Sequence, residues 1–175
     1  MRSICAWCRR PLDDGREDGS PISHGICRLC LDYVQTDRTA IRGFLNTIET
    51  PVLAVDAEGR VISANRLARL ALKKDLAEIS DKLGGEVIEC EYSYLPEKCG
   101  KTIHCTGCQI RASVNATSAT GDPLIRVRAY QHIMTPVGVK TFNYYISTEK
   151  LGEKTVLVRI DEIIPAAAES AEAAK

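Results

Sequence analysis

PVLAVDAEGRVISANRLARLAL, residues 51–72, is the stretch of sequence that decides the fold. Two short apolar runs, at 51–56 and 60–65, flank an Ala-Glu-Gly turn, and this pattern predicts a β-hairpin. Asn65 is a residue type favoured as a helix N-cap, and leucines and alanines follow it at helical spacing. We therefore expect a hairpin that leads directly into a helix.

The last third of the chain predicts three further strands. Apolar and polar residues alternate in the runs 124–135, 139–148 and 154–163, as in half-buried strands. The expected inward-facing residues are Ile125, Val127, Ala129, Phe142, Tyr144, Ile146, Val156, Val158 and Ile160. Short loops between the runs predict an antiparallel meander. With the hairpin, this makes an α+β fold with a five-stranded antiparallel sheet and short helices on one face.

Helices are expected in the remaining periodic segments. Residues 36–50 carry one apolar stripe and predict a linker helix, which packs on its own domain or pairs with a second copy. Residues 75–83 predict a short helix that Gly84-Gly85 breaks, and 103–118 predicts a longer one. The tail 164–175 lacks apolar periodicity and is expected to be disordered.

The stretch 51–72 resembles a PAS domain. The resemblance rests on its D-x-x-G-x-h-x-x-x-N pattern, supported by the final meander, and it covers roughly residues 48–163. It implies a sensor and dimerisation module whose sheet and helices enclose a small pocket, which in some members holds haem, flavin or another small ligand. The resemblance does not name the ligand, because one fold hosts many functions.

Composition limits the classes of function. Lys+Arg and Asp+Glu balance at 23 each, which argues against a broad basic surface for nucleic acid. The sequence has no apolar run of membrane-spanning length and no signal-peptide core at its start, so we expect a cytoplasmic location. Thiols stay reduced there, and the eight cysteines therefore favour metal sites over disulfides.

The first four cysteines predict a structural zinc site. Cys5, Cys8, Cys27 and Cys30 read C-x2-C-x18-C-x2-C, and two such pairs direct four thiolates at one tetrahedral ion. Residues 1–34 are too short to fold on apolar burial alone, so a zinc-ribbon-like module stabilised by metal is expected. Residues 13–25 are rich in turn formers and predict a loop or tight hairpin.

The same segment, ICAWCRRPLDDG…SHGICRLC, also resembles a cysteine-rich segment found beside sensor and response-regulator domains in bacterial signalling proteins. His24 lies three residues before Cys27 and is a possible substitute ligand or hydrogen-bond partner of a sulfur. A redox dithiol and a rubredoxin-type iron are the rival interpretations of the four cysteines, and the thioredoxin-like context that the redox interpretation needs is missing from the sequence pattern.

The other four cysteines form a second group. Cys90, Cys99, Cys105 and Cys108 read C-x8-C-x5-C-x2-C, and the motif CGKTIHCTGCQIR resembles one carried by a subset of bacterial PAS domains with added cysteines. A helix over 103–118 would place the last two thiols on one face near its positive N-terminus.

Several occupants remain open for the second group. Zinc is the usual occupant of a four-sulfur site, an iron–sulfur cluster is held by four cysteines as well, and neighbouring low-pKa thiols also form redox switches. Inert buried thiols are the remaining alternative. His104 and His132 are possible additional contacts, although each fits a structural or exposed role better.

No pattern of a known catalytic site occurs in the sequence, so we expect no enzyme. The prediction is a metal-binding signalling protein that acts through a protein partner or as a homodimer through 36–50. It comprises a four-cysteine module at 1–34, a linker helix at 35–50, a sensor domain at 51–163 and a tail at 164–175. The alternatives are a redox or oxygen sensor that uses the second cysteine group, and a nucleic-acid-binding zinc-ribbon regulator.

Overall fold

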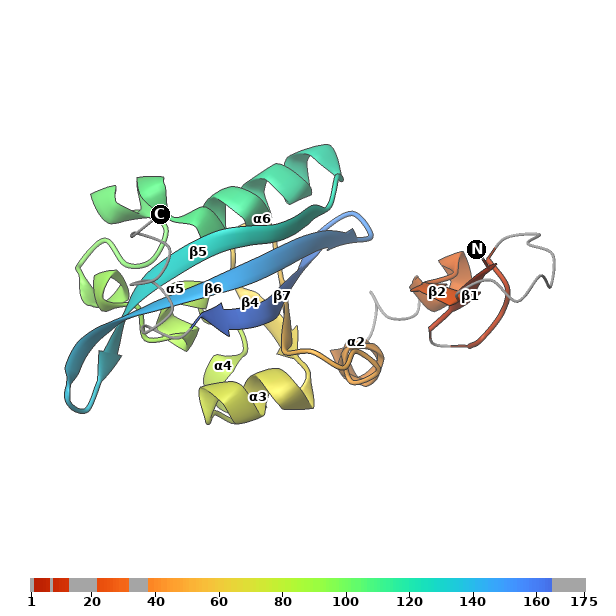
Figure 1. The fold of residues 1–175 in the computed structure, drawn as a ribbon, viewed down its shortest axis with the longest axis horizontal. Helices are drawn as coiled ribbons and strands as arrows, with labels where there is room; N and C mark the ends of the chain where they lie inside the picture. Colours follow the sequence, from red (N-terminus) through yellow and green to blue (C-terminus); the bar gives the residue numbers. More distant parts are fainter. Residues whose placement is uncertain (1, 7, 13–21, 32–37, 165–175) are drawn as a thin grey trace, which may run out of the picture. The chain divides into compact units, whose positions relative to one another are not determined.

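The computed structural model describes residues 2–6, 8–12, 22–31 and 38–164. The chain divides into two compact units, Met1–Glu49 and Thr50–Lys175, which we call the N-terminal unit and the α+β unit (Figure 1). The sequence predicted the start of the second unit at residue 51. In the described part of the chain, no helix is long and apolar enough to cross a membrane.

The N-terminal unit contains two short strands. β1 (Arg2–Cys5) and β2 (Ile22–Gly25) pair in parallel, with Cys5 opposite Gly25. A tight turn follows β1 directly, and Ile4 forms an antiparallel bridge with Pro11 across it. The prediction of a tight hairpin over 13–25 is therefore wrong for residues 22–25, because these pair with a distant strand, and residues 13–21 lie outside the described part.

Helix α2 (Arg38–Leu45) is shorter than the predicted helix at 36–50. Its backbone leaves the helical pattern after Leu45, where the amides of Thr47 and Ile48 bond carbonyls only three residues back. The apolar stripe is buried within the single chain; its buried members are Ala40, Ile41, Phe44 and Leu45.

The α+β unit is built on a five-stranded antiparallel sheet in the order β4-β3-β7-β6-β5. Its strands are β3 (Val52–Val55), β4 (Val61–Ala64), β5 (Leu124–Thr135), β6 (Gly138–Leu151) and β7 (Thr155–Ile164). The predicted α+β fold and its five strands are confirmed. Ile164 belongs to β7 and not to the predicted tail, and residues 165–175 lie outside the described part.

The inward face of β5 departs from the prediction at its start. The register with β6 shifts between Leu124 and Val127, and Arg126 has a left-handed backbone with φ of 51°. This bulge turns Ile125 outward, so that it is 63% exposed. The alternation resumes afterwards, since Ala129 is buried.

Asn65 joins the β3–β4 hairpin to α3 (Arg66–Leu72) as the sequence predicted. Its side-chain oxygen accepts hydrogen bonds from the backbone amides of Ala68 (2.8 Å) and Val52 (3.1 Å). Its side-chain amide donates to the carbonyl of Thr50 at 2.7 Å. One buried side chain therefore caps a helix and fixes the entry into the first strand.

Two one-turn helices follow, and the sequence predicted only the first. In α4 (Leu76–Ile79), the amide of Asp75 bonds the Glu78 carboxylate at 2.7 Å. In α5 (Gly84–Val87), the amide of Leu83 bonds the Glu86 carboxylate at 2.9 Å. Gly84-Gly85 therefore begins a helix instead of ending one, because Glu86 satisfies the free amide at its start.

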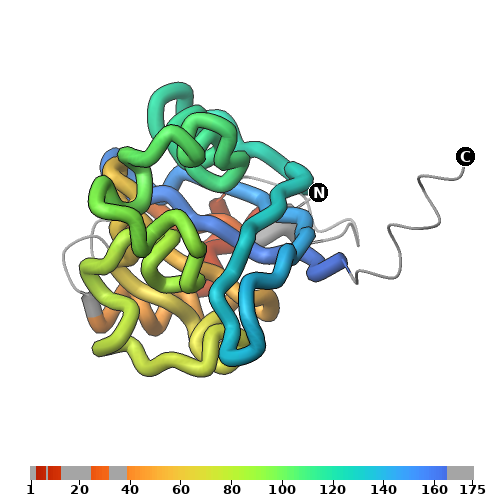
Figure 2. The backbone as a smooth tube through the Cα atoms, turned by 90° about the vertical axis from the view of Figure 1, so that its left-hand side faces the viewer, coloured from red at the N-terminus to blue at the C-terminus, as the bar shows by residue number. Residues whose placement is uncertain are grey.

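The predicted helix at 103–118 is two elements. Residues of η2 (Ile103–Gly107) form a 3₁₀ turn, and α6 (Gln109–Thr120) begins only after Cys108. Another 3₁₀ turn, η1 (Glu91–Tyr94), precedes them. Figure 2 follows this segment, coloured yellow to green, from β4 to the long β5–β6 hairpin. The separation matters for the site, because Cys105 and Cys108 do not share a helix face.

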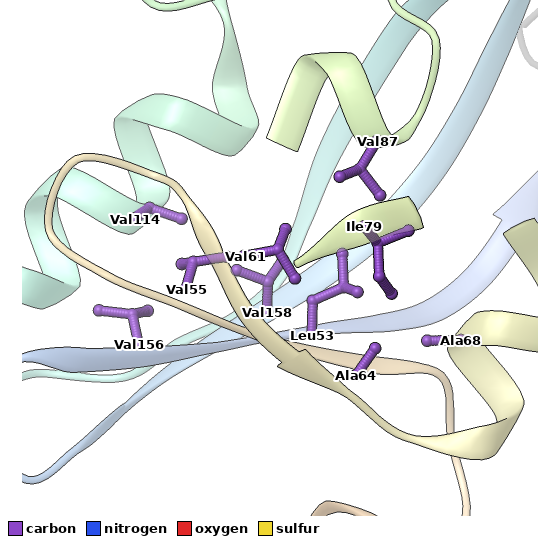
Figure 3. Packing of buried hydrophobic residues seen from close by; sticks show 10 residues of the cluster. All are labelled: Leu53, Val55, Val61, Ala64, Ala68, Ile79, Val87, Val114, Val156 and Val158. Carbon is purple, nitrogen blue, oxygen red and sulfur yellow. The ribbon is translucent and has the colours of Figure 1, made fainter. Parts of the chain in front are cut away.

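The core of the α+β unit lies between the sheet and these helices. Val87 of α5, Val114 of α6 and Ile79 of α4 converge on Val61 and Val158 of the sheet (Figure 3). All five are buried. Their burial holds the segment between β4 and β5 on one face of the sheet.

We predict that Asn65→Ala destabilises the protein by about 2–4 kcal/mol, since it removes a helix cap and leaves buried backbone groups unpaired. Asn115→Ala is the matched control. Asn115 is exposed within α6, and its replacement should change stability by less than about 0.5 kcal/mol. Urea unfolding followed by circular dichroism measures both. Equal midpoints for the two variants would refute the role of Asn65.

Candidate metal centres and cavity

The four sulfurs of the N-terminal unit converge on one point. The Sγ atoms of Cys5, Cys8, Cys27 and Cys30 all lie within 4.8 Å of one another. The Cys8 and Cys27 sulfurs are 3.7 Å apart. Among the described residues, no other group of three or more Cys, His, Asp or Glu side chains brings its possible ligand atoms together in this way.

Backbone geometry brings these sulfurs together. Cys5 ends β1, and the turn after it returns the chain so that the amide of Cys5 donates to the carbonyl of Arg10 at 2.7 Å. The amides of Cys8 (3.5 Å) and Cys27 (3.4 Å) both point at the Cys5 sulfur. These N–H groups stabilise negative charge on a thiolate, as expected around a metal-bound sulfur.

The thiol of Cys30 in this group holds its proton more firmly than an isolated cysteine does. Burial, followed by hydrogen bonds with the other cysteines, raises the pKa of Cys30 to about 12. Four crowded thiols therefore resist losing all their protons unless a cation replaces them. The backbone of His24 lies in β2 opposite Ile4, but its side chain is outside the described part, so the proposed ligand role stays a prediction.

The spacing of the first group suits a single tetrahedral ion. A Zn–S bond of about 2.3 Å places four sulfurs about 3.8 Å from one another. The observed 3.7 Å between Cys8 and Cys27 matches that value. All eight cysteines of the chain are described, and each is a free thiol without a disulfide.

The second group is carried by the loops between α5 and α6. Cys90 is buried, and its backbone bridges Ile133 of β5. Cys105 lies in η2, and Cys108 precedes the first residue of α6. Two backbones adopt left-handed conformations just before cysteines, at Glu89 (φ 59°) and Lys98 (φ 62°). Such strained positions persist only where the surroundings fix them.

Two sulfurs of the second group accept hydrogen bonds from the protein. The backbone amide of Gly100 donates to Cys105 Sγ at 3.1 Å, and the Thr102 hydroxyl lies 3.2 Å from the same sulfur. The Gln131 side-chain amide donates to Cys108 Sγ at 3.3 Å. Thr102 is 5% exposed and Gln131 6% exposed, so both polar groups are buried against sulfur.

The thiols of this group differ in acidity. Burial raises the pKa of Cys90 and of Cys99. For Cys105, burial also acts to raise the pKa, but the hydrogen bonds from Thr102 and Gly100 and the positive charge of Arg111 lower it overall. Cys105 is therefore the member of the group with a lowered pKa, which favours its thiolate.

Gly85 in α5 allows the first two cysteines of the group to approach. A Cβ built on Gly85 would lie 2.6 Å from Cys99 Sγ and 3.6 Å from the Cβ of Cys90. The chain thus needs a residue without a side chain at this position to hold both cysteines close to α5.

All four sulfur-bearing residues line a single cavity of about 440 Å³ in the α+β unit. The rest of its wall is largely apolar and includes Leu53, Val114 and Ile146. The polar side chains of the wall include Gln131 and Arg111. They also include the ion pair of Lys74 and Glu89, in which Lys74 Nζ lies 2.8 Å from Glu89 Oε1. Such a cavity suits a small, mainly apolar ligand.

The two predicted histidines of the second group join aromatic residues at the cavity wall. The ring of His104 stacks on Tyr92 with centroids 4.0 Å apart, and His132 meets Tyr92 edge-on at 5.9 Å. His132 also pairs with the Thr141 hydroxyl at 3.0 Å. These contacts connect the loops that carry Cys90 and Cys105.

Sequence reasoning missed the groups that contact the sulfurs. Gln131 carries a usable signal, since it is a polar residue two positions after Ala129 on the inward face of β5. Thr102 and Gly85 carry no such signal, because only the folded loops bring them to the cysteines.

Comparisons with known proteins find similar architectures. No family model and no curated protein sequence matches the chain. A domain of a sensory box histidine kinase/response regulator from Geobacter sulfurreducens is 19% identical, with 74% of this chain and 96% of that one covered and a TM-score of 0.46. The PAS domain of BvgS from Bordetella pertussis is 14% identical, with 81% and 93% covered and a TM-score of 0.45.

A third solved structure is the PAS domain of the quorum-sensing receptor RpfR from Cronobacter turicensis, in complex with C12:0. It is 14% identical, with 67% of this chain and 96% of that chain covered and a TM-score of 0.43. At such identities the likeness concerns architecture alone. What the present chain does must follow from its own cysteines and cavity.

We predict that Gly85→Ala displaces Cys99 and destabilises the protein by about 1–3 kcal/mol, because the new methyl group overlaps a sulfur. Gly107→Ala is the matched control, since a Cβ there meets no atom within 4 Å. Its stability should stay within about 0.5 kcal/mol of the natural chain. Urea unfolding compares them, and an unaffected Gly85→Ala variant would show that the loop is looser than described.

Proposed function

We propose that this chain is a PAS-type sensory signalling protein whose N-terminal unit is held together by structural zinc. The observation that carries the metal site is the convergence of four sulfurs within 4.8 Å. The sensory part of the proposal draws on the α+β sheet, the cavity it encloses and the sequence pattern at Asp56–Asn65. The proposal assigns no catalytic residues.

Zinc is the metal that fits the first group best. Four thiolates complete its tetrahedral shell and leave no open position for a substrate, as in structural sites. The described strands of the N-terminal unit are only four residues each, so metal binding would supply much of its folding free energy. The proposal keeps the expected cytoplasmic location, where thiols stay reduced and available to metal.

The second group gives the α+β unit its own metal site in this proposal. Cys90, Cys99, Cys105 and Cys108 line the cavity, and two of them accept hydrogen bonds from buried donors. A metal at this position would contact the space that a small ligand occupies. Metal and ligand would then influence each other's binding, because they share one wall.

The signal would pass to a protein partner or to a second copy of the chain. Pairing through the predicted helix at 36–50 stays one proposed route to a homodimer. The exposed apolar residues of the β5–β6 hairpin offer a different surface; they include Tyr130, Met134, Val137 and Val139. Light scattering on the purified chain would determine whether it self-associates.

We predict about one zinc per chain in the N-terminal unit, lost in Cys8→Ala. Cys8 is exposed, so its replacement removes a ligand with little loss of packing. Leu29→Ala is the matched control, because Leu29 lies between Cys27 and Cys30 in sequence, offers no metal ligand and is 64% exposed. Elemental analysis of both purified variants measures the zinc.

Chelation gives an independent measurement. Removal of zinc should shift the amide signals of residues 2–12 and 22–31 in a ¹H–¹⁵N spectrum and leave those of the sheet strands in place. Equal zinc content in Cys8→Ala and Leu29→Ala would contradict a structural zinc site. Amide signals of the N-terminal unit that do not shift on chelation would contradict it as well.

A further inference from the structure

The two cysteine groups of this chain differ in what surrounds their sulfurs. In the N-terminal unit, the four sulfurs close on one point within 4.8 Å. In the α+β unit, the four cysteines line the wall of a cavity of about 440 Å³. The first arrangement fits one ion, whereas among the described residues the sulfurs of the second group do not gather in that way and lie along the cavity wall.

The wall of that space is largely apolar near the cysteines. Cys90 is 8% exposed, and apolar residues such as Ile110 and Tyr144 form the neighbouring wall. The apolar character of the surrounding wall influences the electronic properties of a bound group.

Donors already point at two of the sulfurs. Gly100 N–H and the Thr102 hydroxyl meet Cys105, and the Gln131 amide meets Cys108. A hydrogen bond from a buried amide or hydroxyl to a neutral thiol contributes little free energy. The same donor forms a stronger, charge-assisted hydrogen bond with a thiolate. The donors therefore indicate that these sulfurs are negatively charged when the site is filled.

We infer that Cys90, Cys99, Cys105 and Cys108 hold an iron–sulfur cluster in the cavity wall, and not a single zinc ion. Four thiolates are the usual ligands of such clusters, and a cluster is larger than one ion because it contains several irons bridged by sulfide. This inference rests on the proposed second metal site and names its occupant. It makes the sensory unit responsive to oxidants.

The surrounding groups would then tune the cluster. Hydrogen bonds to the ligating sulfurs, burial and local charge set the reduction potential of an iron–sulfur centre. Thr102 and Gln131 supply such bonds, and Arg111 supplies positive charge near Cys105. All three favour the reduced, more negative cluster, so their removal should lower its potential.

The test uses the full chain, purified without oxygen and reconstituted with ferrous iron and sulfide. Elemental and sulfide analysis should find iron and acid-labile sulfide in equal amounts, together with zinc and a brown colour. Cys108→Ser should lose iron and colour and keep zinc. Cys8→Ala should do the reverse, which serves as the reciprocal control.

A second pair of variants examines the donors. Thr102→Val removes a hydroxyl that meets a sulfur, and Thr106→Val removes one that donates to the carbonyl of Ile103 at 2.7 Å. Voltammetry should show a lower reduction potential for Thr102→Val and an unchanged one for Thr106→Val. Both variants should retain iron.

Failure of this inference differs from failure of the proposed function. A colourless protein with two zinc ions and no iron after reconstitution would overturn the cluster and leave both metal sites standing. A protein whose second group binds no metal, or forms disulfides in air without having held iron, would also overturn the cluster. Absence of zinc from the natural chain, or zinc retained in Cys8→Ala, would instead refute the proposed structural site.

Discussion

The pairing of β3 with β7 is the constraint on which the rest of the α+β unit depends. It places Val52 opposite Arg159 and so brings the first strand of the unit beside the last one. The hairpin at one end of the sheet and the meander at the other become one surface (Figure 1). The long segment between β4 and β5 must then cross a single face, where its apolar residues cover the sheet and its cysteines line the cavity.

Local pattern was enough to predict most elements of the sheet. Alternation located β5 from Leu124 to Thr135, and Asn65 was recognised as a cap because its residue type and position suffice. The pattern could not reveal the bulge at Arg126, since the left-handed backbone there depends on pairing with β6. It also merged η2 with α6, because helical spacing does not distinguish a 3₁₀ turn from the helix that follows it.

The arrangement of the two cysteine groups could be predicted from the sequence to different degrees, for a physical reason. In the N-terminal unit, the short spacing of each C-x2-C pair keeps its two sulfurs close, and the pairing of β1 with β2 brings the two pairs together. In the α+β unit, Cys90 and Cys99 come from separate loops, and their positions depend on Gly85 and on the bridge to β5. The donors Thr102 and Gln131 reach the sulfurs only through tertiary structure.

The bridge between the Cys90 loop and β5 has a consequence for the rim of the sheet. β5 is one of the two outermost strands, and an unpaired outermost strand is a template for another chain. Here the amide of Met134 donates to the carbonyl of Glu89 at 2.8 Å, and Cys90 faces Ile133. The loop that carries a cysteine of the cavity therefore also shields part of this rim. Withdrawal of the loop would expose the backbone donors and acceptors of β5 to a neighbouring polypeptide. A change at the cysteines of the cavity that moved this loop would therefore open an edge for strand pairing with another chain.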